Sequence, residues 1–240
     1  MPQQQDRMGF ALLAGGILLG LVFLGFLLGQ AAMNYKQLDR SVTVKGLSER
    51  EYPADIVIWP IQFNIASNDL GELYQMLDSQ SSQIRAYLRS NGIGASEISV
   101  STPAITDKSA QQYGNETQVV YRYTALQTVT VYSSDIETVR AVMGSLSELG
   151  KQGIVFTGDA YQTQTEYLFT RLNDIKPDMI EEATRNAREV AQKFAADSDS
   201  SLGKIRKASQ GQFSITARDK NNPHMKKVRV VSTVEYYLSD

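Results

Sequence analysis

The chain has 240 residues, of which 42% are hydrophobic and 21% are charged, as is typical of a protein with a packed core. Its 24 basic and 26 acidic residues give a net charge of −2, so no positive excess is present to neutralise phosphates and we expect no nucleic-acid partner. The chain has no cysteine and one histidine, His224, which excludes disulfides and thiolate catalysis and disfavours a histidine triad or a multi-histidine metal site.

The segment 10–33 is predicted to be a membrane anchor. No charged side chain occurs between Arg7 and Lys36, and the apolar run inside this gap matches the roughly 20 helical residues that a bilayer core needs. Secretory signal cores are usually shorter, about 7–15 residues, so we favour an uncleaved signal-anchor. The small residues around Gln30 leave a cleaved signal as the alternative. Residues 1–9 are then a short cytoplasmic tail, and residues 41–240 are exported.

Glycines in this segment recur at a spacing that favours contact between helices. Gly16 and Gly20 are four residues apart, and so are Gly25 and Gly29. Small residues at this spacing let helix backbones approach closely in lipid. The pattern predicts that the anchors associate with one another, surrounded by membrane lipid.

Two strands are expected after the anchor, over residues 41–51 and 57–65. The second is clearer, because its apolar residues alternate with others, as in a strand with one buried face. Pro60 cannot donate a ladder hydrogen bond, so we expect this strand to lie at a sheet edge or to be bulged there. Edge strands can pair with another chain. Its apolar residues are therefore candidate subunit contacts: Val57, Trp59, Ile61 and Phe63.

The rest of the chain reads as alternating strands and helices. Polar caps at Asn68-Asp69 and Ser134-Asp135 each predict a helix start, and Asn91-Gly92 predicts the end of the first helix. Pro177 is expected in the first turn of the longest helix. The further expected elements are strands at 98–105, 119–131, 154–164, 205–217 and 227–238, with a hairpin loop at 108–117 and a loop at 218–225.

This order of elements predicts an α+β fold. Helices do not alternate strictly with strands, so we expect a largely antiparallel mixed sheet packed with about three helices and preceded by one N-terminal transmembrane helix. The exported part is long enough for one large domain or two small ones. Two β–α–β lobes that share one sheet are one such arrangement.

The sequence offers no pattern of catalytic or ligand-binding residues. The stretch 197–201 resembles the start of a calcium loop, but Leu202 stands where that loop needs glycine and Ala208 where it needs glutamate. No glycine-rich phosphate loop, nucleophile elbow or metal-ligand cluster is recognisable. We therefore expect no enzyme activity, no cofactor and no metal.

Several stretches together resemble the SIMPL-domain family of bacterial envelope proteins. They are Val42–Asp55, Tyr121–Val131 followed by Asp135, Leu172–Ile180, Ala183–Ser198, and the C-terminal segments Gly203–Ile205, Gln210–Ile215, Arg218–Asp219 and Lys227–Val231. The chain departs from the family pattern at Leu47-Ser48, where a second glycine is common. The resemblance covers roughly residues 41–238.

This resemblance implies an envelope protein of unknown function with an α+β fold. Some members are periplasmic and immunogenic, some assemble into ring-like or channel-like homo-oligomers, and links to oxidative or envelope stress have been proposed. No catalytic residues can be carried over. We accordingly expect a single-pass protein of the bacterial inner membrane whose C-terminal domain lies in the periplasm.

Two functional hypotheses remain open. In the first, anchored subunits assemble into a homo-oligomeric ring or cage. In the second, the chain is an exported binding module that recognises an envelope ligand or a partner protein through the loops 108–117 and 218–225. A pore through the anchors is less favoured, because the segment carries no charged lining residue.

Overall fold

A computed structural model describes residues 3–37, 40–110, 120–157 and 164–239. The first element is helix α1 (Gln3–Gln37). Within it, the segment Ala14–Ala31 is long and apolar enough to cross a membrane, although a signal sequence near an N-terminus has the same properties. The predicted N-terminal apolar helix is therefore confirmed, and both its roles, anchor or signal, remain compatible with it.

The chain divides into two compact units. Unit 1 comprises Met1–Glu49, Pro177–Phe213 and Arg229–Asp240, and unit 2 comprises Arg50–Lys176 and Ser214–Val228. The predicted α+β class with largely antiparallel strands is confirmed. The strands form two sheets, so the arrangement of two lobes that share one sheet is not the one adopted.

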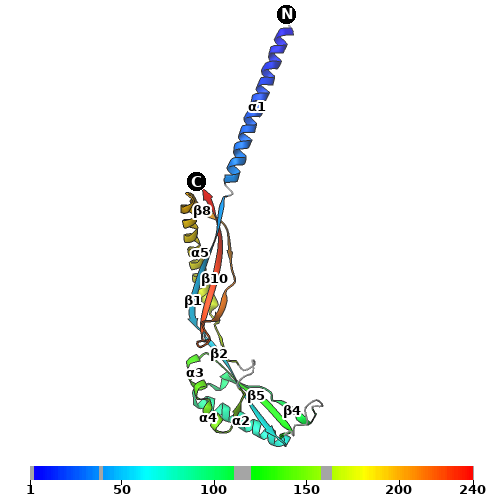
Figure 1. Ribbon diagram of the computed structural model, residues 1–240, viewed down its shortest axis with the longest axis vertical. Coiled ribbons are helices and arrows are strands. Elements are labelled where there is room, and N and C mark those ends of the chain that lie inside the picture. Colours follow the sequence, from blue (N-terminus) through cyan, green and yellow to red (C-terminus); the bar gives the residue numbers. More distant parts are fainter. Residues whose placement is uncertain (1–2, 38–39, 111–119, 158–163, 240) are drawn as a thin grey trace. The chain divides into compact units, whose positions relative to one another are not determined.

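The sheet of unit 1 has the strand order β1-β10-β8, formed by β1 (Ser41–Pro53), β10 (Met225–Ser239) and β8 (Ser201–Gln210). The short strand β9 (Ser214–Ala217) also pairs with β10. Helix α5 (Leu172–Asp197) runs alongside β1 and β10 (Figure 1). Its start lies five residues before Pro177, so this proline lies inside the helix and not in the first turn as expected. Proline has no N–H, so one i→i−4 hydrogen bond of the helix is missing there.

Helix α5 approaches its sheet unusually closely. A Cβ atom added to Gly46 of β1 would collide with the carbonyl oxygen of Ala183 and the amide nitrogen of Ala187. The buried stripe of α5 consists of Met179 and four alanines spaced by four: Ala183, Ala187, Ala191 and Ala195. Val190 and Phe194 lie outside this stripe and are exposed.

Unit 2 has a sheet with the order β3-β5-β2-β6, to which β4 adds at β5 and β7 at β2. Apolar side chains of β2 and β5 face α2, α3 and α4 and form the core of the unit. The caps act as expected: the side chain of Asp69 accepts from the Glu72 N–H, and that of Asp135 from the Thr138 N–H. The elements are α2 (Leu70–Ser90), α3 (Ile136–Ser145), α4 (Ser147–Lys151), β2 (Ile56–Ser67), β3 (Ile98–Val100), β4 (Ala104–Asp107), β5 (Tyr123–Ser133), β6 (Val155–Phe156) and β7 (Glu166–Leu168), with short 3-10 turns at Ala95–Glu97 and Lys108–Ala110.

Several predicted boundaries in unit 2 differ from the structure. The single strand expected at 98–105 is two strands, and the helix expected to start after Ser134-Asp135 breaks at Leu146 into α3 and α4. Of the strand expected at 154–164, only β6 is described, and β7 was not predicted. Residues 111–117 of the expected hairpin loop lie outside the described residues.

Candidate functional site

The glycine pairs of α1 are sterically open in this single chain. Cβ atoms added at Gly16, Gly20, Gly25 and Gly29 would meet nothing within 4 Å. The two pairs are offset by nine residues, which is about 2.5 turns of an α-helix. One pair therefore lies on the opposite face of the helix from the other, which the spacing of four alone did not reveal.

Strand β2 lies inside its sheet and not at an edge. The prediction that its apolar residues make edge contacts with another subunit is therefore wrong. It pairs with β5 from Val57 to Ser67, and on its other flank with β7 at Ile56–Ile58 and with β6 at Phe63–Asn64. Two- and three-residue strands leave almost no trace in a sequence, which is why the second flank was missed. The four proposed contact residues belong to the core of unit 2, each at most 6% exposed: Val57, Trp59, Ile61 and Phe63.

Pro60, which has no N–H to donate, lies where β2 needs no hydrogen bond on one of its flanks. It lies between the stretch of β2 that pairs with β7 and the stretch that pairs with β6. Its missing N–H therefore interrupts neither of these short ladders. In this chain the proline thus marks a break between two short partner strands on one flank of an interior strand.

Strand β8 is an edge strand of the sheet in unit 1. It pairs with β10 on one flank, and among the described residues no strand pairs with its other flank. All its side chains from Gly203 to Gln210 are exposed, so neither face of the strand is covered. Edge strands present unpaired backbone groups to other chains. At the other end of this sheet, β1 likewise pairs only with β10 in the part that the structure describes.

A β-bulge shapes the solvent face of this sheet. Lys207 pairs with Glu235 and Ile205 with Tyr236, so Arg206 is an extra residue in β8. Arg206 donates to the Glu235 carboxylate at 3.1 Å, and the Ser41 hydroxyl donates to the same oxygen at 2.6 Å. The Ser41 hydrogen bond is the main cause that lowers the pKa of Glu235 below its ordinary value, with Arg206 contributing.

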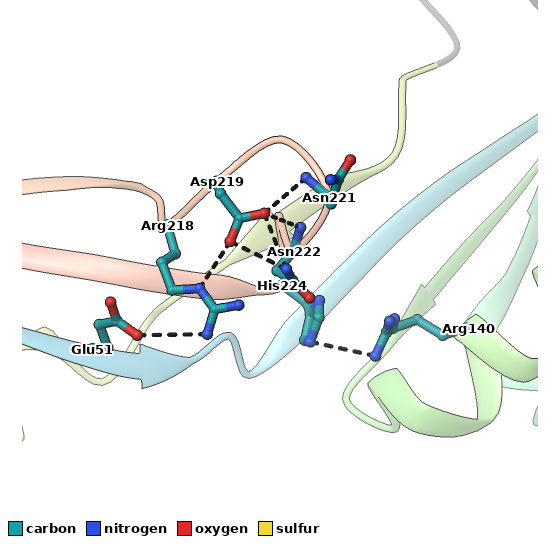
Figure 2. A network of polar contacts seen from close by, with 7 residues as sticks. All are labelled: Glu51, Arg140, Arg218, Asp219, Asn221, Asn222 and His224. Atoms are coloured by element: carbon teal, nitrogen blue, oxygen red, sulfur yellow. Dashed lines mark hydrogen bonds and ion pairs between the residues drawn. The ribbon is translucent and has the colours of Figure 1, made fainter.

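In unit 2, a carboxylate organises the 218–225 loop (Figure 2). Asp219 accepts hydrogen bonds from the backbone N–H groups of Asn221 and Asn222 at 2.9 and 2.8 Å, and from the Asn222 side chain. It also accepts from Arg218 at 2.9 Å, which is the largest of the causes that lower its pKa to about 2. Arg218 reaches Glu51 at 3.6 Å as well. The loop that we expected to be merely polar is thus held in one conformation.

This loop places His224 against helix α3. The imidazole Nε2 lies 3.3 Å from Nη1 of Arg140, and the ring also packs edge-on against Tyr167, with centroids 6.1 Å apart. The backbone N–H of Ala54 donates to the His224 carbonyl at 2.7 Å, which fixes the loop to the end of β1. Burial, followed by the charges of Arg140 and Arg218, lowers the pKa of His224 below its ordinary value.

A pocket of about 410 Å³ opens beside this histidine. It is lined by the end of β1, the first residues of α3, Arg140, His224 and Met225. Sequence reasoning treated His224 as an ordinary loop residue and did not single out Arg140. The two lie 84 positions apart, and no local pattern connects them.

With this geometry described, the chain can be compared with known proteins. The model of the SIMPL family, which is described as a protein of unknown function (DUF541), matches residues 42–235. The chain belongs to the SIMPL family. No curated protein matches it. The match confirms the resemblance inferred from the sequence, and residues of both units fall within it.

The SIMPL match assigns no catalytic residues to this chain. Among the described residues of this SIMPL protein, no three His, Cys, Asp or Glu side chains lie together as a metal would require. The expectations of no enzyme activity, no cofactor and no metal stay predictions. Two features of this SIMPL chain remain as candidates for function, the open β8 edge of unit 1 and the His224 pocket of unit 2.

Proposed function

We propose that this SIMPL chain is a membrane-anchored, non-enzymatic subunit of the bacterial envelope that assembles head to tail with its own copies into a closed ring or cage. The observation that carries the proposal is the open flank of β8, a strand of ten residues. The proposed anchor is α1, with unit 1 and unit 2 in the periplasm. As its physiological setting we propose envelope or oxidative stress, on the basis of the family resemblance alone.

Outward-facing backbone groups of β8 can be assigned from the ladder. The Gly211 N–H donates to the Val231 carbonyl at 2.8 Å, toward β10. Inward and outward groups alternate along a strand. The N–H groups of Ala208 and Gln210 therefore face away from β10, where a strand of another subunit can accept their hydrogen bonds.

The charges of β8 favour head-to-tail pairing over two-fold pairing. The strand carries Lys204, Arg206 and Lys207 and no acidic residue. If two β8 strands paired about a two-fold axis, these cations would lie opposite or diagonal to one another, which destabilises a sheet. Strand β1, the other open edge, carries both signs, as in Lys45 and Glu49. Pairing of β8 with the β1 of the next subunit is heterologous, and such contacts form a ring when the rotation from one subunit to the next closes.

The membrane helix supports the same arrangement. Its two glycine pairs lie on opposite faces, so one helix can contact two neighbours, one through Gly16 and Gly20 and the other through Gly25 and Gly29. A simple dimer needs only one such face, whereas each member of a ring has two neighbours.

The test compares two variants at one position of β8. Ala208→Pro removes an outward N–H that no bond within the subunit uses, whereas Ala208→Val keeps the N–H and suits a strand. We expect the wild type and Ala208→Val to form large particles in mild detergent, by light scattering and electron microscopy. Ala208→Pro is expected to give much smaller species with unchanged circular dichroism. Equal particle masses for the two variants would show that the open flank of β8 does not hold the subunits together.

A further inference from the structure

The pocket beside His224 is independent of assembly, because all its lining residues belong to unit 2. Within it, Arg140 pairs with no carboxylate among the described residues. Its one polar side-chain contact there is with the imidazole of His224, at 3.3 Å. Two other arginines of the unit are paired with carboxylates, Arg122 with Asp107 at 2.9 Å and Arg171 with Asp55 at 3.3 Å.

The contact with Arg140 also leaves the imidazole of His224 with an unsatisfied hydrogen-bond donor. A guanidinium group can only donate hydrogen bonds, so Nε2 of His224 must accept and the ring proton must sit on Nδ1. Nδ1 is buried and has no hydrogen-bond partner. A buried donor without an acceptor is unfavourable, and few native groups are left in that state.

The acidic groups near the pocket neither pair with Arg140 nor accept a hydrogen bond from Nδ1 of His224. Asp219 is engaged by Arg218 and the loop N–H groups, and Asp135 accepts from the N–H and the hydroxyl of Thr138. Glu51 lies 3.6 Å from Arg218, and Glu137 is exposed at the start of α3. The remaining facing group, Tyr167, is an uncharged phenol whose pKa is raised, mainly by burial.

We propose that this pocket binds the oxyanion group of a small ligand, a carboxylate or a phosphate, between the Arg140 guanidinium and Nε2 of His224. In the bound state Arg140 donates to the oxyanion, which is a strong charge-assisted interaction. The imidazole then carries its proton on Nε2 and donates to the same group, so Nδ1 becomes a bare acceptor and the buried donor disappears.

The site is held ready for this ligand. The Asp219 hydrogen bonds fix the loop, and the Ala54–His224 backbone bond fixes the position of the imidazole. Binding then requires a change of tautomer and little reordering of the backbone.

The chain itself supplies the probe for the test. His224 is the only histidine, so its imidazole gives one isolated NMR signal in the full-length protein in detergent. Sodium phosphate and, separately, sodium acetate are titrated at constant ionic strength. We expect a saturable shift of the imidazole signal. Saturation by phosphate alone assigns phosphate ligands, and saturation by both anions assigns oxyanions in general.

Two charge-matched variants decide whether the site is specific. Arg140→Gln removes the proposed ligand-binding cation and is expected to weaken binding by about tenfold or more. Arg185→Gln removes an exposed arginine of α5 in unit 1, which lies 3.8 Å from Glu181, and is expected to leave binding unchanged. The proposal is overturned if neither anion gives a saturable shift, or if Arg140→Gln and Arg185→Gln respond alike.

Discussion

Strands β2 and β8 contrast in a way that their sequences do not suggest. β2 carries the clear apolar alternation and a proline, and it is paired on both flanks in the core of unit 2. β8 carries mostly polar residues, and it is paired on one flank and exposed on both faces. A strong period-two pattern therefore indicates a strand that its own chain has already buried. The strand left open to a partner is the one without that pattern.

The largest expected effect is a difference in stability between alanine variants of two phenylalanines, one in each unit. Phe63 of β2 is fully buried, whereas Phe194 of α5 is 55% exposed. Phe63→Ala is expected to lower the free energy of unfolding by about 3–5 kcal/mol, because it leaves a cavity. Phe194→Ala is expected to change it by about 0.5 kcal/mol or less. Chemical denaturation followed by circular dichroism measures both. Similar losses would contradict the burial that the comparison rests on.

A second effect tests the close contact between α5 and β1. Gly46→Ala adds a Cβ where backbone atoms of Ala183 and Ala187 already lie, so the helix must move away from the sheet. We expect a loss of about 1–3 kcal/mol or more, as in overpacked cores. Gly150→Ala serves as the control, because its Cβ would meet nothing within 4 Å. Thermal unfolding gives the melting temperatures of both variants. Equal melting temperatures would show that α5 does not pack closely against β1 at Gly46.

A smaller effect is expected at the start of α3. The Asp135 carboxylate accepts from the Thr138 hydroxyl at 2.6 Å and from the Thr138 N–H at 3.0 Å. The hydroxyl, followed by the N–H, lowers the pKa of Asp135 below its ordinary value. Asp135→Ala should cost about 1 kcal/mol, whereas Asp135→Asn, which is also a good cap, should cost much less. Urea denaturation of the two variants side by side gives the difference. If the two variants lose equal stability, the cap is not the cause.

The smallest effect concerns pH. The pKa of His224 is lowered in the folded chain, chiefly by burial, so between that pKa and 6.5 the unfolded state binds more protons than the folded state. The stability that this group contributes is present above pH 6.5 and is lost as the pH falls below it. Asp107 and Asp219, each with a pKa of about 2, do not titrate in this range. Melting temperatures from pH 8 to 5 should fall less steeply in His224→Gln than in the wild type.

Local signals in the sequence were enough for much of the fold. The caps at Asp69 and Asp135 and the turn at Gly92, with its φ of +94°, depend only on neighbouring residues, so they could be predicted. Strands β6 and β7 could not, because their partners in β2 lie about a hundred positions away and they contribute only two and three residues.

The candidate site shows the same division. The 218–225 loop was noticed for its polarity, but the Asp219 hydrogen bonds that order it depend on the folded backbone. The meeting of Arg140 with His224 depends on tertiary packing between a loop and a helix start. The open edge of β8 was missed for a further reason, since an unpaired flank is a property of the whole sheet and of no single segment.

The central claim, that β8 of one subunit pairs with β1 of the next, can be tested by cross-linking, because the chain has no cysteine of its own. Ser209→Cys is combined in turn with Thr43→Cys, Lys45→Cys or Leu47→Cys and oxidised in detergent. Within one subunit β10 separates these strands by about 10 Å, too far for a disulfide. Head-to-tail assembly predicts a ladder of covalent multimers from at least one double variant and only monomers from each single variant. A dimer from Ser209→Cys alone, or no ladder from any pair, would contradict it.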